Sequence, residues 1–135
     1  MYAARADALD HRRYREWLDA TKASQEPFGL ASTVMSGFVR VVTHPRIFAT
    51  PSSPETAFAF VDALRGAPGA VAIEPGSRHW SLFERLCLDA GAKGNLVTDA
   101  YVAALAIESG CELITTDRDF ARFSGLRWRH PLTPA

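Results

Sequence analysis

The stretch that decides the fold reads Leu113-Ile114-Thr115-Thr116-Asp117-Arg118-Asp119-Phe120, in which an apolar run ends in two carboxylates. A third carboxylate, Asp99, opens the helical segment before it, within Gly94-Asn95-Leu96-Val97-Thr98-Asp99. Open α/β sheets bind their ligands at the carboxyl ends of parallel strands, where these acids are expected. Mg²⁺ and Mn²⁺ prefer carboxylate and water oxygens to nitrogen and sulfur. The pattern therefore predicts an acidic pocket that suits such a cation.

Each of these side chains also has a local structural explanation. An acid in the first helical turn, such as Asp99, complements the helix dipole. Asp117 and Asp119 can cap the short turn that follows the strand. Thr115 and Thr116 offer hydroxyl groups to the cluster, but threonine is also an ordinary strand residue. The functional interpretation depends on a parallel topology that brings Asp99 and Asp117 into one pocket.

Composition is typical of one globular domain. The 135 residues are 47% hydrophobic and have a formal net charge of zero, so no global charge directs the chain to nucleic acid or membranes. Arginines nevertheless gather at the end of the chain, and an Arg-rich codon bias explains them as well as phosphate binding does. These arginines are Arg118, Arg122, Arg127 and Arg129.

The remaining composition favours a cytoplasmic protein. Cys87 and Cys111 lie in apolar segments and are expected to be buried free thiols, as in a reducing compartment. No apolar run reaches the roughly 18 residues that a membrane helix needs, and no signal-peptide pattern opens the chain. The four histidines share no metal-ligand spacing, so we expect them at the surface or in the core: His11, His44, His79 and His130.

Helical and extended patterns alternate along the chain. A helix is expected from Asp10 to about Ala23, a second from Ser32 to before Pro45, and a third after Ser53, followed by Pro54 at its first position. Further helices are expected after a Ser77 cap, with Trp80 turned inward, and over 98–109, ended by Gly110. Strands are expected over 70–73, 111–116 and 126–128. This alternation predicts an α/β fold of three layers, with a mainly parallel central sheet flanked by helices.

The same residues resemble the PIN-domain ribonucleases. The similarity is greatest to VapC toxins of type II toxin–antitoxin systems, particularly a mycobacterial-type subgroup. The matching segments are Asn95-x-x-x-Asp99-Ala100-x-x-Ala103-Ala104-x-Ala106, Leu113-x-Thr115-x-Asp117-x-x-Phe120, 38–48 and 120–128. Matched segments extend over nearly the whole chain, which is expected to be a single PIN-like domain over 1–135.

The resemblance implies an endoribonuclease that cuts RNA with Mg²⁺ or Mn²⁺ held by carboxylates. Asp99 and Asp117 would be the metal ligands and catalytic acids, Thr115 a supporting hydroxyl and Asp119 a helper behind them. The family also implies a VapB-type antitoxin as partner, a homodimer, and tRNA or ribosomal RNA as target. The arginines at the end of the chain would contact the RNA backbone.

Two departures from the family pattern stand out. PIN domains open with a strand that ends in an Asp, whereas residues 1–7 align after that strand and Asp7 is a poor substitute. A Glu is also expected on the second helix, where Gly37 stands. If an internal Met has been taken as the start, a longer form should be the more stable one.

Two alternatives remain open. One is a catalytically inactive PIN-like module that still binds antitoxin or RNA. The other is an unrelated α/β fold, such as a phosphatase or receiver domain, whose acidic pocket binds Mg²⁺.

Overall fold

The computed structural model describes residues 1, 3–8 and 10–133, and its contacts divide the chain into two compact units. The first unit comprises Met1–Ala72 and the second Ile73–Ala135. The single domain expected over 1–135, without its first strand, stays a prediction.

The first unit contains three helices, whose helical form was expected from the sequence. They are α1 (His11–Ala23), α2 (Ser32–Val42) and α3 (Pro54–Arg65). The start of α3 follows the prediction, because the Ser53 hydroxyl accepts the Thr56 backbone N–H at 3.1 Å and Pro54 needs no hydrogen-bond acceptor. Asp10 does not cap α1 through its side chain; its φ of 56° places it in the left-handed region instead.

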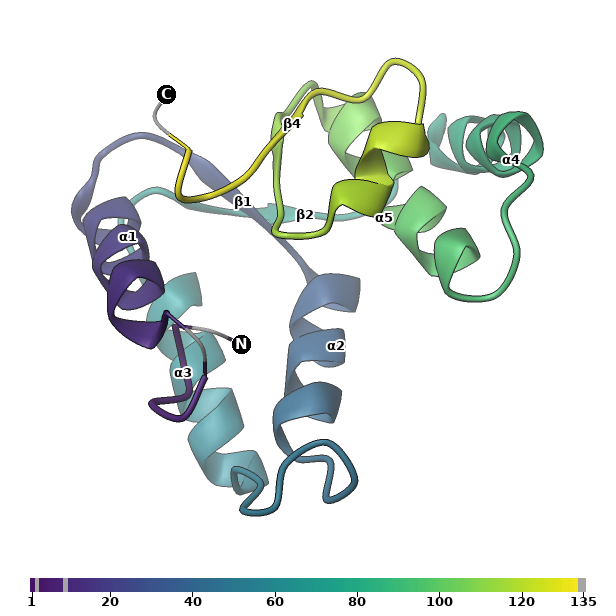
Figure 1. The fold of residues 1–135 in the computed structure, drawn as a ribbon. Coiled ribbons are helices and arrows are strands. Elements are labelled where there is room, and N and C mark those ends of the chain that lie inside the picture. Colours follow the sequence, from purple (N-terminus) through teal and green to yellow (C-terminus); the bar gives the residue numbers. More distant parts are fainter. Residues whose placement is uncertain (2, 9, 134–135) are drawn as a thin grey trace. The chain divides into compact units, whose positions relative to one another are not determined.

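Helices α2 and α3 lie side by side (Figure 1). Their contact includes the rings of Phe38 and Phe60, whose centroids are 5.2 Å apart. Strands β1 (Phe28–Ala31) and β2 (Ala70–Ile73) pair in a sheet of two strands.

The second unit is built on a pair of helices, α4 (His79–Ala90) and α5 (Asn95–Ser109), joined by a short loop. Helix α5 ends as predicted at Gly110, whose φ of 69° is left-handed and therefore favours glycine. Alanines on α5 allow close packing, and they form the core with Leu86, Phe120 and Phe123. These alanines are Ala100, Ala103 and Ala104.

After α5 the chain forms β3 (Leu113–Ile114), the 3₁₀ helix η1 (Arg118–Arg122) and β4 (Trp128–Arg129). Strands β3 and β4 are parallel, with Leu113 opposite Trp128 and Ile114 opposite Arg129. The acidic segment therefore lies in the connection between two parallel strands (Figure 1). Helices with parallel strands confirm the predicted α/β class.

Several boundaries differ from the sequence-based expectation. Within the described residues the strands form two sheets of two strands, and the strand expected over 111–116 is paired only at Leu113 and Ile114. Helix α5 begins at Asn95, three residues early, and Cys111 is exposed rather than buried. Trp80 was expected to point inward, yet it is 67% exposed.

Helix α4 begins at His79 rather than after a Ser77 cap, because a side chain of α5 holds the loop that precedes it. The Glu108 carboxylate of α5 accepts the backbone N–H of Gly76 at 2.7 Å and that of Arg78 at 2.9 Å. A Cβ atom on Gly76 would lie 2.7 Å from this carboxylate, so a larger residue there would make the Glu108 side chain shift. These N–H groups hold the pKa of Glu108 below its ordinary value.

Candidate active site

Asp99 lies in the second turn of α5, next to the fully buried Ala100. Gly94 precedes the helix with a φ of 57°, which turns the chain into α5. The Asp99 side chain belongs to a half-buried residue on a well-packed helix, so its position is fixed by the core. An acid at this place is partly removed from water.

Asp117 and Asp119 lie in a turn that their own side chains organise. The Asp117 backbone N–H donates to the Thr115 hydroxyl at 3.1 Å, and the Asp119 N–H donates to Asp117 Oδ1 at 2.8 Å. Asp117 is thus the N-cap of η1, as its local explanation proposed. The Thr115 hydroxyl therefore holds the backbone of this turn, and its expected support of the carboxylates stays a prediction.

Phe120 and Phe123 attach this turn to α5. Both are buried in the core cluster with Ala100, Ala103 and Ala104, and the centroids of their rings are 5.9 Å apart. Asp117 and Asp119 therefore lie within three residues of Phe120, which packs against α5, the helix that contains Asp99.

Electrostatics shows that the acids converge. Burial raises the pKa of Asp99 above its ordinary value, and the negative charges of Asp117 and then of Asp119 raise that pKa further. Two separate elements thus bring Asp99 and Asp117 together, and Asp119 belongs to the same electrostatic group. Like charges held together in a partly buried place are a recurrent feature of functional sites.

The donor set is suited to a hard cation, which would relieve the repulsion between the acids. Among the described residues, no group of three or more His, Cys, Asp and Glu side chains is assembled for a metal ion. Two carboxylates still fit Mg²⁺, because this ion usually keeps several waters and takes few protein ligands.

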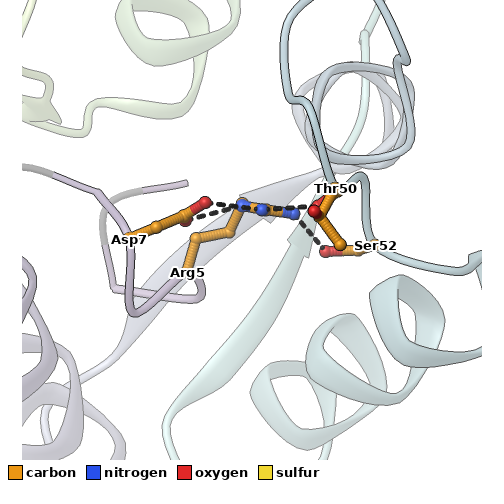
Figure 2. A network of polar contacts seen from close by, with 4 residues as sticks. All are labelled: Arg5, Asp7, Thr50 and Ser52. Carbon is orange, nitrogen blue, oxygen red and sulfur yellow. Dashed lines mark hydrogen bonds and ion pairs between the residues drawn. The ribbon is translucent and has the colours of Figure 1, made fainter.

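Asp7 is a poor candidate for the first acid of the family pattern, because its carboxylate is already paired. The Arg5 guanidinium donates to both Asp7 oxygens, at 2.9 and 2.7 Å, and also to the Ser52 hydroxyl and the Thr50 carbonyl (Figure 2). The guanidinium carbon lies 4.0 Å from the centre of the Phe48 ring. No local pattern predicts this group of contacts, which we call the Arg5 clamp, because the fold brings Arg5 to residues more than forty positions away.

Gly37 lies inside α2, where the family pattern has a Glu. No atom lies within 4 Å of the position that a Cβ atom would take at this residue. Local space therefore does not explain why a glycine stands there.

His79 is 2% exposed, and its Nε2 lies 2.9 Å from the Tyr101 carbonyl oxygen. Its ring also contacts those of Phe83 and Tyr101. This histidine packs in the core, as expected.

Comparison with known proteins identifies the family. The PIN domain model matches residues 1–126. The chain is 48% identical to VapC ribonuclease Mb2897 of Mycobacterium bovis, over 98% of this chain and 90% of that protein. It is 41% identical to ribonuclease VapC25 of Mycobacterium tuberculosis, over 96% of this chain and 91% of the relative.

A solved structure shares the fold. The crystal structure of VapBC2 from Rickettsia felis, bound to a DNA fragment from its promoter, contains a chain that matches with a TM-score of 0.69. The sequences are 16% identical, and the match covers 96% of this chain and 90% of that one. In the described residues no helix is both long and apolar enough to span a membrane. With the α/β fold and the acids of α5 and η1, these matches show that the chain belongs to the VapC-type branch of the PIN-domain family.

Proposed function

We propose that this chain is a metal-dependent endoribonuclease, the toxin of a VapBC-type toxin–antitoxin pair. The central observation is that Asp99 lies on α5 and Asp117 at the cap of η1, two elements that pack together through Phe120 and Phe123, with their carboxylates near enough for the charge of Asp117 to contribute to the raised pKa of Asp99. The relatives named above are ribonucleases by name, which supports RNA as the substrate. In this proposal the two carboxylates are the ligands of Mg²⁺, with Mn²⁺ as a substitute.

The chain's own groups have separate tasks in this reaction. Asp99 is held in place by α5 and Asp117 by the η1 cap, so both are positioned before substrate arrives. A bound Mg²⁺ would lower the pKa of a water and offset charge on the phosphodiester. Asp119 is a helper rather than a metal ligand in this proposal. Its backbone N–H donates to Asp117 Oδ1 and so orients that carboxylate. Thr115 holds the turn through the Asp117 N–H.

The partner and target follow by family analogy. A VapB-type antitoxin is the expected partner, and the solved structure with the same fold is named as a VapBC2 complex. We also propose a homodimer, tRNA or ribosomal RNA as target, and a cytoplasmic location.

A catalytically inactive PIN-like module is the second candidate. Gly37 stands in place of one expected acid, and Asp7 is engaged by Arg5 and so cannot take the place of another. If the two remaining acids are insufficient, the chain would bind antitoxin or RNA without cutting.

Cleavage of total tRNA and ribosomal RNA by the purified chain, with Mg²⁺, Mn²⁺ or EDTA, distinguishes these candidates. The proposal expects cleavage with either metal, none with EDTA, and none by Asp99→Asn or Asp117→Asn. Asp62→Asn is the matched control, since Asp62 is an exposed acid of α3. Absence of cleavage by the parent chain under every condition would instead favour the inactive module. Full activity of Asp99→Asn would remove that residue from the site.

A further inference from the structure

The arginines near the end of the chain fall into two structural groups. The sequence alone does not distinguish the roles of these arginines, which are Arg118, Arg122, Arg127 and Arg129. The structure separates them into two pairs, one engaged with the fold and one facing solvent.

Arg127 and Arg129 stabilise the fold. The Arg127 guanidinium donates to the Gly110 carbonyl oxygen at 3.1 Å, which satisfies an acceptor at the end of α5. Arg129 donates to the Glu112 carboxylate at 3.1 Å and to the Thr133 carbonyl oxygen at 3.3 Å. Both guanidinium groups are therefore committed to neighbours along the β3–β4 pair.

Arg118 and Arg122 have no such commitment. Both residues are exposed on η1, and no hydrogen bond or ion pair within the described part of the chain engages either guanidinium. Arg118 stands between Asp117 and Asp119 in the sequence, yet it pairs with neither carboxylate. Since Phe120 anchors η1 in the core between them, the two arginines start from a fixed backbone.

These observations bear on how a polyanion reaches an acidic site. Asp99, Asp117 and Asp119 together repel an RNA backbone, because each adds a negative charge where phosphates must approach. Positive side chains beside the acids offset this repulsion and fix the register of the backbone. Arginine suits this role, since its planar fork matches the geometry of a phosphate group.

We propose that Arg118 and Arg122 bind the RNA backbone beside the acidic pair, whereas Arg127 and Arg129 are structural. This inference rests on the proposed function, because it assumes that RNA is the substrate. It names two positioning residues for that reaction. They act by contact with phosphates, so they should favour no particular base sequence.

The test measures RNA binding separately from cleavage. Fluorescence anisotropy of a labelled single-stranded RNA, in EDTA and over a range of NaCl concentrations, gives the salt dependence of the binding constant. The variants are Arg118→Gln with Arg122→Gln, compared with Arg127→Gln and Arg129→Gln as matched controls. Thermal midpoints of all variants show which substitutions disturb the fold.

Each phosphate contact with a single strand adds about 0.7 to the slope of log K against log salt. The paired Arg118 and Arg122 substitution should therefore lower the magnitude of the slope by about 1.4 and weaken binding at least tenfold, without a change in thermal midpoint. Lysine at both positions should keep most of the slope. The Arg127 and Arg129 controls should keep the slope but lower the midpoint.

Several results would overturn the inference. An unchanged slope in the paired variant, with RNA cleavage intact in the parent chain, refutes the role of these arginines but leaves the proposed function standing. A lowered midpoint like that of Arg129→Gln would make them structural. Loss of antitoxin binding with the RNA slope retained would assign them to a protein partner. If the parent chain neither binds nor cuts RNA, this inference and the proposed function both fail.

Discussion

Replacing Phe120 by alanine should damage both the stability of the second unit and the geometry of its acids. Phe120 is 7% exposed and packs among alanines of α5 and against the Phe123 ring. Burial of such a side chain contributes about 1.5–3 kcal/mol. The cavity left in an alanine-lined site raises the loss to roughly 3–5 kcal/mol. For a chain of this length, that corresponds to a fall of about 10–20 °C in the thermal midpoint.

The assay for Phe120→Ala is thermal and urea unfolding in EDTA, with Phe58→Ala as the matched control. Phe58 lies on α3 and is 55% exposed, so its loss should change the free energy of unfolding by about 1 kcal/mol or less. A second readout is the pKa of Asp99, measured by NMR. If η1 loses its anchor, the charges of Asp117 and Asp119 move away and this pKa should fall toward its ordinary value. Equal losses of stability in both variants, or an unmoved pKa of Asp99, would refute the packing argument.

Three further substitutions follow from the structure. Asp99→Asn should raise the thermal midpoint in EDTA. The pKa of Asp99 is raised in the folded state, so ionisation of this carboxyl destabilises the fold. The parent should therefore lose stability relative to the variant as the pH rises from about 3.8. A variant less stable than the parent at neutral pH would contradict the like-charge cluster. Glu108→Gln should instead lower the thermal midpoint at neutral pH. The pKa of Glu108 is lowered in the folded state, so the ionised carboxylate stabilises the fold above about pH 4.5, and this contribution is lost on acidification. The acid limb of the variant's stability curve should be flatter, and an unchanged limb would exclude the Gly76 contact. Gly37→Glu should increase stability by roughly 0.5 kcal/mol, because glycine is a poor residue inside a helix and the position is open. A lower thermal midpoint for this variant would show that the space is not free.

The convergence of the acids could be predicted from the sequence because its determinants are mostly local. A strand ending in acids is visible in eight consecutive residues. Asp99 was expected in the first turn of a helix over 98–109, but α5 begins at Asn95 and places Asp99 in its second turn. The step from this pattern to neighbouring acids used the rule that parallel strands end at one edge of their sheet. The buried aromatics Phe120 and Phe123 supplied what the pattern did not show, the attachment of η1 to α5.

What the sequence did not reveal depends on contacts between distant residues. The predicted start of α4 after a Ser77 cap was wrong. The loop before α4 is held by Glu108, which lies thirty positions after Arg78 in the sequence. The Arg5 clamp likewise joins residues that no local pattern relates. The exposure of Trp80 was not predicted. An apolar stripe shows which face of a helix is buried, but it does not show how far along the helix the core extends.

In the proposed function, Asp99 and Asp117 hold a divalent cation. Calorimetric titration of the purified chain with Mn²⁺ near neutral pH tests it without any assumption about the RNA target. We expect saturable binding by the parent chain and by Asp62→Asn, and loss of that binding in both Asp99→Asn and Asp117→Asn. Binding of equal strength in all four proteins, or none in the parent chain, would contradict it.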